Sequence, residues 1–367
     1  MTRACLHIGL NKTGSSSIQK WLGTNAPHLR AHGVVYDPLR QNQHYVGNLH
    51  AEFCATISHK LGEICPVYSV RHTLGIKTLE TQARIAAQFE EFLKAKVKQS
   101  SRDSLFILSS EYLPNCVTTP NKADTLRAFM ERYFDDVKIV TYIRRQEDFI
   151  PSHWSQLAKY APIKALDEYV QQHPIRDYAA VLAPFEAAFG VDRIKLRLAS
   201  PDILSGKSLI EDFCEVLGIE TVNARSDVHE NKSPSAAALE LLRNFTRSHP
   251  SHFKTGYMNP RYREFYDVVK MKDKSYSPLT LTKAQAIGIR LANKDSNEII
   301  RKSYFAHRPE LFPEKLTDLP EHIDLLPEVT ALAIDVAEHF QVRQWRAPGY
   351  RYFRDLFETA LHSRRTS

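Results

Sequence analysis

The sequence predicts an α/β fold in which helices cover both faces of a central parallel sheet, followed by a helical C-terminal elaboration. Two observations carry this prediction. Apolar runs of strand length alternate with segments of helical periodicity up to about residue 220, which is the pattern of a parallel sheet in a three-layer sandwich. From about residue 234 onward the pattern is mostly helical.

Four short segments have the composition of buried strands. Residues 3–10 and 104–110 are apolar runs that end in polar residues, and residues 137–143 are rich in β-branched side chains. Residues 194–198 follow as a fourth parallel strand. Apolar residues spaced i, i+3 and i+4 predict the helices between them, through Ile18, Trp21 and Leu22 and over residues 79–97, 122–133 and 146–160.

We expect residues 1–367 to form a single domain. Residues 1–220 would be its α/β core, and residues 221–367 its mainly helical C-terminal part. A polar, aromatic-rich stretch at 249–280 interrupts the helical pattern there. Insertions shape specificity more readily than cores do, so this stretch is the candidate ligand-specific element, the alternative being a solvated loop.

Composition excludes several classes of protein. Of the 367 residues, 43% are hydrophobic and 25% are charged, which is typical of a folded globular protein and argues against global disorder. Lys and Arg outnumber Asp and Glu by 49 to 42. This excess is too dilute for a nucleic-acid-binding surface, so we expect no nucleic-acid partner. It does fit a chain that binds one strongly anionic ligand.

The location of the protein is also constrained. No apolar run approaches the roughly 18 residues that a membrane span requires, so we expect no transmembrane segment. The five cysteines are scattered and form no CxxC, which indicates neither a disulfide framework nor a zinc site. We therefore expect a cytoplasmic protein.

The clearest local motif is HIGLNKTGSSSIQ at residues 7–19, between the first strand and the first helix. A turn at that point presents backbone N–H groups at a helix N-terminus, where the dipole favours an anion. Gly14 allows close approach of a phosphate, Ser15 adds a hydroxyl and Lys12 adds charge. The loop is P-loop-like, although its lysine precedes the glycine, unlike GxxxxGK[ST]. A ligand-free turn remains the alternative.

A second motif follows the strand at 137–143, which runs directly into Arg144. Ligands of open α/β sheets bind at the carboxyl ends of the strands, where this arginine falls. Ser152 comes two helical turns later. If a helix begins near Gln146, the two side chains can converge on one anion. A solvated loop or a carboxylate partner for Arg144 is the alternative.

Together the two motifs resemble those of the sulfotransferases that use 3′-phosphoadenosine 5′-phosphosulfate (PAPS), in particular a bacterial branch whose first motif reads HIGxxKTGTTSLQ. This sequence departs from that branch at Ser15 and Ser16, where threonines are usual, and at Gln146, where many relatives carry proline; the physical roles are kept. Further stretches resemble the same branch, namely GVVYDP (33–38), LSSEYL (108–113), YIRRQEDFIPS (142–152), IEDFCEVLGI (210–219), NKSPSAAALELLR (231–243) and NEIIRKSYFAHRPELF (297–312).

The resemblance implies a role for each matched residue. PAPS would be the co-substrate, and its sulfuryl group would move by in-line displacement to an acceptor. Lys12 would stabilise charge on the bridging oxygen, and Arg144 with Ser152 would hold the 3′-phosphate. The 5′-phosphosulfate would be held by the first loop, that is, by Lys12, Thr13, Gly14, Ser15 and Ser16. No metal is needed, since the donor already carries a good leaving group.

An acceptor hydroxyl also needs a base. Glu111 stands where family members carry a catalytic His or Glu, and partial burial would raise its pKa and make it a better proton acceptor. Glu111 could instead cap the next segment or pair with a lysine. His44 and His50, in a polar stretch, are the alternative bases. A carbohydrate or glycolipid hydroxyl is the expected acceptor by family habit, with peripheral contact to a lipid-linked acceptor as one option and a small alcohol or phenol as another.

Two other functions stay open. A P-loop nucleotide kinase or NTPase would have a GK[ST] ending and an acidic magnesium ligand after a later strand, whereas the strand at 137–143 leads to Arg144. A catalytically silent nucleotide- or glycan-binding protein of the same fold would have lost the lysine or the base, whereas Lys12 and Glu111 are both present.

Overall fold

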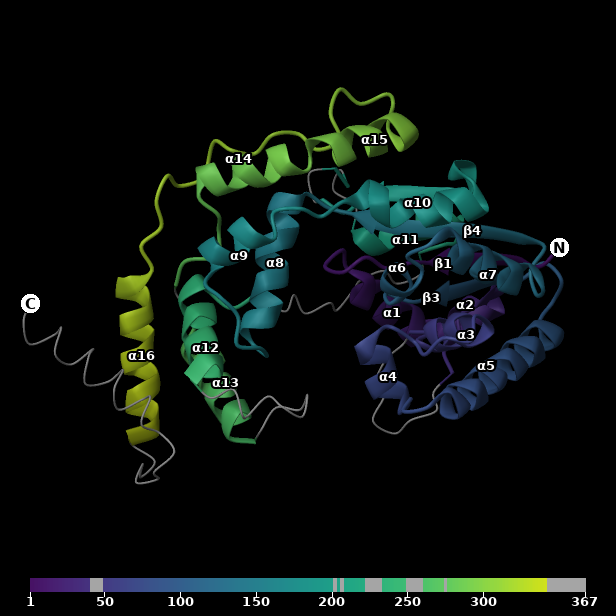
Figure 1. Cartoon of the computed structure of the whole chain (residues 1–367), viewed down its shortest axis with the longest axis horizontal. Helices are drawn as coiled ribbons and strands as arrows, with labels where there is room; N and C mark the ends of the chain where they lie inside the picture. Colours follow the sequence, from purple (N-terminus) through teal and green to yellow (C-terminus); the bar gives the residue numbers. More distant parts are fainter. Residues whose placement is uncertain are drawn as a thin grey trace, which may run out of the picture. The chain divides into compact units, whose positions relative to one another are not determined.

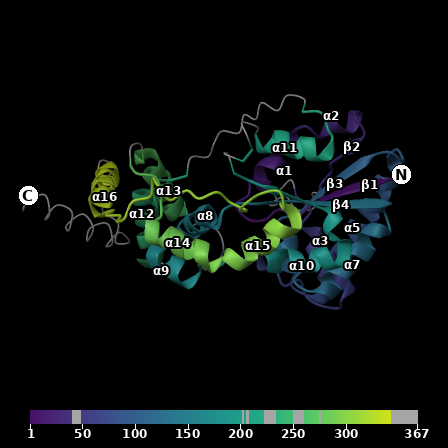
Figure 2. The ribbon, with the colours of Figure 1, turned by 90° about the horizontal axis from the view of Figure 1, so that it is seen from above.

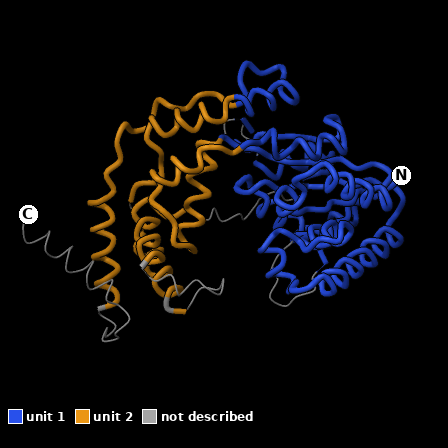
Figure 3. Tube along the Cα trace, in the orientation of Figure 1, with its two compact units in different colours: residues 1–145, 177–229, 295–311 blue, residues 146–176, 230–294, 312–367 orange. Residues whose placement is uncertain are grey.

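The chain forms two compact units, each assembled from three segments (Figure 3). The computed structural model describes residues 1–39, 49–200, 203–204, 208–221, 233–248, 260–273 and 276–341. The first unit comprises residues 1–145, 177–229 and 295–311, and the second comprises 146–176, 230–294 and 312–367. These units interleave along the sequence, so they differ from the predicted division at residue 220: part of the helical C-terminal region belongs to the first unit, and residues 146–176 belong to the second.

The first unit is built on a five-stranded sheet whose strands all run parallel (Figure 1). The four predicted strands are confirmed; a two-residue edge strand, β2, was not predicted because it is too short to show a period. The order across the sheet is β2 (Val34–Val35), β3 (Leu105–Ser109), β1 (Arg3–His7), β4 (Asp136–Ile143) and β5 (Ile194–Leu198).

Helices cover both faces of this sheet, as predicted. Trp21, Leu22 and Phe213 pack on one face against Cys5 and Val140. In Figure 2 that face carries α1 (Ser15–Thr24), α2 (Ala26–Ala31) and α11 (Leu209–Leu217), whereas the other face carries α3 (Glu52–Lys60), α5 (Leu79–Gln99), α7 (Pro120–Glu131) and α10 (Tyr178–Phe189). The first unit also contains two shorter helices, α4 (Tyr68–Leu74) and α6 (Leu113–Cys116), and nearly all of α15 (Lys294–Tyr304).

Two buried histidines meet at Ser109, the last residue of β3. The Nδ1 atom of His7 lies 2.8 Å from the Ser109 Oγ, and the backbone N–H of Ser109 donates to Nδ1 of His50 at 3.1 Å. His50 packs among aromatic rings, including Phe53 and Phe89. Burial lowers the pKa of both histidines to about 4, so both are neutral near pH 7.

The described part of the second unit is helical. It consists of α8 (Gln146–Ala158), α9 (Leu166–Gln172), α12 (Ala236–Ser248), α13 (Pro260–Lys272), α14 (Lys283–Ala292) and α16 (Leu326–Gln341). One apolar cluster joins α8, α9, α12 and α14, and another joins α12, α13 and α16. Among the helices that the structure describes, none has both the length and the apolarity needed to cross a membrane.

The sequence predicts a break in the helical pattern at 249–280, and this prediction is wrong over residues 260–272. This stretch is α13, and its Tyr262 and Phe265 are buried in the cluster shared with α12 and α16. Two of the aromatic side chains that made the segment resemble a recognition loop, Tyr262 and Phe265, are therefore core residues. Residues 249–259 lie outside the described part of the chain.

Acid denaturation tests the burial of the two histidines. An unfolded chain binds protons at histidine as the pH falls below 6.5, whereas the folded protein excludes them until about pH 4. The contribution of each buried histidine to the free energy of unfolding is therefore fully present above pH 6.5. Roughly 3 kcal/mol of it per histidine is lost as the pH falls toward 4. Urea unfolding across this range should show a smaller loss in His50→Asn than in the wild type; equal losses would contradict the assignment.

Candidate functional site

The carboxyl ends of three neighbouring strands define the candidate site. Strand β1 lies between β3 and β4. The loop that follows β1 is therefore flanked by Glu111, which comes after β3, and by Arg144, which comes directly after β4. The topology therefore brings Lys12, Glu111 and Arg144 to the same edge of the sheet, which is the edge at which open α/β sheets bind ligands.

The loop after β1 has an unusual backbone conformation at its lysine. Lys12 has φ +64°, and within the described ranges no other non-glycine residue has a positive φ. The left-handed conformation costs an ordinary L-residue roughly 1–2 kcal/mol. Gly14 also has a positive φ, of +87°. The hydroxyls of Thr13 and Ser15 donate to the carbonyl of Leu10 at 2.7 and 3.4 Å, so both side chains help to fold the loop.

Space and backbone conformation explain the two glycines. A Cβ atom on Gly9 would lie 2.3 Å from the Oγ of Ser15 and 3.4 Å from the Cβ of Glu111. A Cβ atom on Gly14 would lie 2.2 Å from a methyl carbon of Leu209 in α11. Glycine is therefore required by space at Gly9, where the Cβ of Ser15 would also lie 2.7 Å away. At Gly14 the requirement comes from the positive φ, since the Leu209 methyl group is the end of a flexible side chain.

The loop leads into α1 with a row of backbone donors. Gly14 is the N-cap of α1 and provides no side-chain cap. In the backbone hydrogen bonding of the described residues, the N–H groups of Thr13, Gly14, Ser15 and Ser16 do not serve as donors, whereas those of Ser17 and Ile18 donate to the carbonyl of Gly14. Four N–H groups at the positive end of a helix dipole make this turn a candidate anion site.

Buried polar contacts hold the end of β1 in place. The Oγ of Ser109 lies 2.8 Å from Nδ1 of His7 and accepts a hydrogen bond from Nε2 of Gln19 in α1 at 3.0 Å. On the other side, the Thr141 hydroxyl donates to the carbonyl of Ile8 at 2.7 Å. His7 is thus a buried strand residue that anchors the end of β1 before the loop.

Sequence reasoning missed the contribution of α11. Its Asp212 is buried and accepts hydrogen bonds from the Tyr142 hydroxyl at 2.7 Å and from the Arg197 guanidinium at 3.0 Å. These contacts fix α11 against β4 and β5, and thereby fix Leu209 against Gly14. Only long-range pairing shows this role, since the amphipathic pattern around Leu209 looks like any other helix.

Three charged side chains influence one another at the site. Partial burial lowers the pKa of Lys12, the positive charge of Arg144 lowers it further, and the charge of Glu111 opposes both. Burial raises the pKa of Glu111, which the charge of Lys12 partly offsets. A lysine with a weakened hold on its proton beside a carboxyl group with an increased affinity for protons is an arrangement suited to proton transfer.

Arg144 and Ser152 fall in different units. Arg144 donates from its guanidinium to the backbone carbonyl of Lys12 at 3.1 Å, and its own carbonyl accepts from the Tyr178 hydroxyl at 2.8 Å. Ser152 lies on α8 in the second unit and is partly exposed. The convergence of Arg144 and Ser152 on one anion therefore stays a prediction.

The alternative bases differ in status. His50 does not lie in a polar loop, as the sequence suggested, but in the aromatic core, because the segment after it folds into the buried helix α3. His44 lies outside the described residues. Across the part of the chain that the structure describes, no group of three or more His, Cys, Asp or Glu side chains is placed to hold a metal ion.

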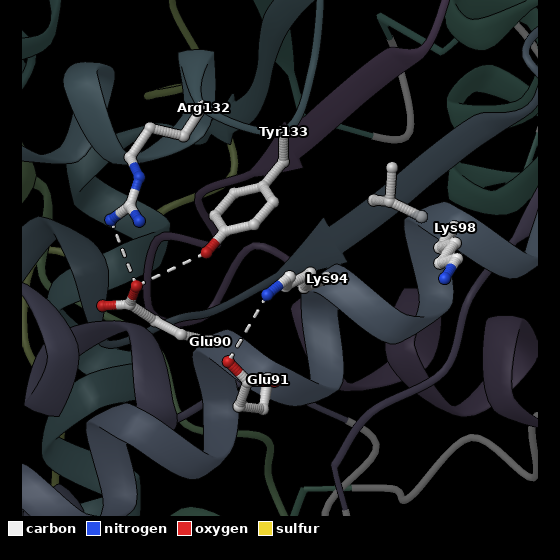
Figure 4. A pocket seen from close by; sticks show the side chains of 7 residues that line it. Glu90, Glu91, Lys94, Lys98, Arg132 and Tyr133 are labelled. Atoms are coloured by element: carbon white, nitrogen blue, oxygen red, sulfur yellow. Dashed lines mark hydrogen bonds and ion pairs between the residues drawn. The ribbon is translucent and has the colours of Figure 1, made fainter.

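A charged surface pocket lies elsewhere in the first unit (Figure 4). Seven residues line it. Five belong to α5 and two follow α7, namely Glu90, Glu91, Lys94, Val97 and Lys98, and then Arg132 and Tyr133. Glu90 accepts hydrogen bonds from Arg132 and from the Tyr133 hydroxyl. Because α5 leads into β3 and residues 132–133 lead into β4, this pocket faces the amino ends of the strands. It is not part of the site at their carboxyl ends.

Comparisons with known proteins show only weak similarities. No family model and no curated protein sequence matches the chain. A sulfotransferase from Alicyclobacillus acidocaldarius is 14% identical with a TM-score of 0.32, over 59% of this chain and 81% of its own. The sulfotransferase domain of the Synechococcus PCC 7002 olefin synthase is 12% identical with a TM-score of 0.33, over 79% and 93%. Similarities this weak carry no information about function.

Substitution of Gly9 tests the packing of the loop. Gly9→Ala should destabilise the protein by roughly 1–3 kcal/mol, because the added methyl group overlaps Ser15. Gly288→Ala is the matched control, since a Cβ there meets nothing within 4 Å in α14 and alanine favours a helix by roughly 0.5–1 kcal/mol. Equal unfolding free energies for the two variants in urea titrations would contradict this packing.

Proposed function

We propose that the protein is a sulfotransferase that moves a sulfuryl group from PAPS to an acceptor hydroxyl. The observation that carries the proposal is the loop after β1, in which a left-handed Lys12 precedes four backbone N–H donors, with Glu111 on one side and Arg144 on the other. The sequence motifs that resemble PAPS-dependent sulfotransferases fall on these same residues.

The donor nucleotide fits the charges of the loop. Thr13, Gly14, Ser15 and Ser16 offer the N–H groups that would bind the 5′-phosphosulfate, and Arg144 with Ser152 would bind the 3′-phosphate. During in-line transfer, negative charge grows on the oxygen that bridges sulfur and phosphorus. The ammonium group of Lys12 would stabilise that charge, so catalysis would come mainly from positioning and electrostatics.

Glu111 would serve as the base. Its carboxylate takes the proton from the acceptor hydroxyl as the acceptor oxygen attacks sulfur and the bond from sulfur to the phosphate oxygen breaks. The raised pKa of Glu111 supports this role, because the affinity of a base for a proton should approach what the reaction demands. A carbohydrate or glycolipid acceptor, with peripheral contact to a lipid-linked form, and a cytoplasmic location complete the proposal. No metal participates in it.

Nucleotide selectivity is the first test. In titration calorimetry without magnesium, the protein should bind the product 3′-phosphoadenosine 5′-phosphate (PAP) more tightly than ADP or ATP, and Arg144→Ala should remove most of that preference. We expect a loss of about tenfold or more, as for a hydrogen-bonded ion pair. Equal binding of all three nucleotides, or tighter binding of ATP once magnesium is added, would favour the kinase alternative.

Turnover separates the roles of Lys12 and Glu111. Release of PAP from PAPS by slow transfer to water requires no knowledge of the acceptor. Lys12→Ala should reduce its rate by on the order of a hundredfold or more, and Glu111→Gln by on the order of a hundredfold, with thermal unfolding little changed. Exposed Lys20 on α1 provides the control Lys20→Ala, which should turn over at the wild-type rate. Full activity in Lys12→Ala would contradict the mechanism.

A further inference from the structure

We propose that Arg144 is a positioning residue for Lys12: its guanidinium holds the lysine backbone in the left-handed conformation, and so preforms the donor loop before any nucleotide binds. This role is distinct from binding the 3′-phosphate. It deepens the proposed function, but the contact itself belongs to the ligand-free protein.

The conformation of Lys12 requires a stabilising partner. Lysine has no intrinsic preference for positive φ, in contrast to glycine, asparagine or aspartate. Such a conformation persists only where the surroundings over-determine it, and it concentrates at functional sites. The carbonyl of Lys12 accepts the Arg144 hydrogen bond at 3.1 Å. A hydrogen bond from a charged donor to that carbonyl fixes the orientation of the peptide plane after Lys12, which the φ and ψ angles of Lys12 set together.

Arg144 is itself well placed to act as a fixed donor. It follows β4 without a gap, and the Tyr178 hydroxyl of α10 donates to its carbonyl at 2.8 Å. Strand β4 is paired to β1 on one side and to β5 on the other. The guanidinium is thus attached to the rigid centre of the sheet, whereas the loop that it holds has few backbone bonds of its own.

A positioning role for Arg144 would couple the part of the site that binds the 5′-phosphate to the part that binds the 3′-phosphate. The turn that Lys12 makes sets the direction of the N–H groups from Thr13 to Ser16. If Arg144 holds that turn, then loss of Arg144 weakens binding of the 5′-phosphate group even when the nucleotide has no 3′-phosphate. A residue that only binds the 3′-phosphate would have no such effect.

Amide hydrogen exchange of the ligand-free protein tests the positioning role independently of nucleotide binding. The reporters are the N–H groups of Ser17 and Ile18, which donate to the Gly14 carbonyl at 3.0 and 3.2 Å. In Arg144→Met these amides should exchange about tenfold faster or more, because the turn before them loosens. In the control Lys20→Met, which removes an exposed cation from the same helix, exchange should stay at the wild-type rate.

A second background distinguishes backbone strain from general destabilisation. Asparagine enters the left-handed region several-fold more readily than lysine. In a Lys12→Asn background, Arg144→Met should therefore accelerate exchange at Ser17 and Ile18 much less than it does in the wild type. An equal acceleration in both backgrounds would mean that Arg144 acts through some other contact, and would overturn the proposal.

Nucleotide affinity completes the test. Titration with AMP, which has a 5′-phosphate and no 3′-phosphate, should show about tenfold weaker binding in Arg144→Met than in Lys20→Met. If AMP affinity and amide exchange are both unchanged while PAP affinity falls, Arg144 binds the 3′-phosphate only and the positioning role is wrong. If no nucleotide binds to the wild type but exchange rises as expected, the positioning role holds and the proposed function fails.

Discussion

The backbone turn between β1 and α1 is the constraint from which the rest of the site follows. The chain leaves a central strand that is hydrogen-bonded on both sides, reverses through Lys12 and Gly14 with positive φ at both, and enters α1 without a side-chain cap. The first N–H groups of a helix have no acceptor within the helix. In the proposed function the phosphate of the donor nucleotide would accept from them.

The remaining parts of the first unit support that turn from several directions. Ser109 connects β1, β3 and α1 through His7 and Gln19, all of them buried. In the helical layer that also contains α1, helix α11 packs Leu209 against Gly14, and the contacts of Asp212 hold α11 in place. A loop with few backbone bonds of its own thus acquires a single conformation from its neighbours. This preorganisation matters most for a reaction catalysed by charge placement, since donors that are already oriented need no rearrangement at the transition state.

The sequence is sufficient to predict the parts that depend on local pattern. The β-branched run at 137–143 and the apolar run at 104–110 appear as β4 and β3, and the Gly, Ser and Lys composition of the first loop predicts the turn found between β1 and α1. Phosphate binding by that turn stays a prediction. Local pattern is not sufficient where tertiary contacts decide. The polar residues around His50 suggest an exposed loop, yet His50 is buried in the aromatic core.

Long-range contacts account for the other differences. The aromatic residues of α13 suggest recognition, yet Tyr262 packs in a helical cluster. The hydrogen bond from Arg144 to the Lys12 carbonyl joins residues that are 132 positions apart. No periodic pattern in the sequence indicates such a contact. The packing of Leu209 against Gly14 cannot be predicted from the sequence either, because it depends on where α11 packs. These contacts turn a plausible motif into a defined geometry.

A crystal structure of the protein with PAP bound would test the central claim most directly. The account predicts the 5′-phosphate within hydrogen-bonding distance of the N–H groups from Thr13 to Ser16, with Lys12 still at positive φ and its ammonium group beside the phosphate. A nucleotide bound away from this loop, or a loop in which Lys12 has turned to negative φ to admit the phosphate, would contradict it.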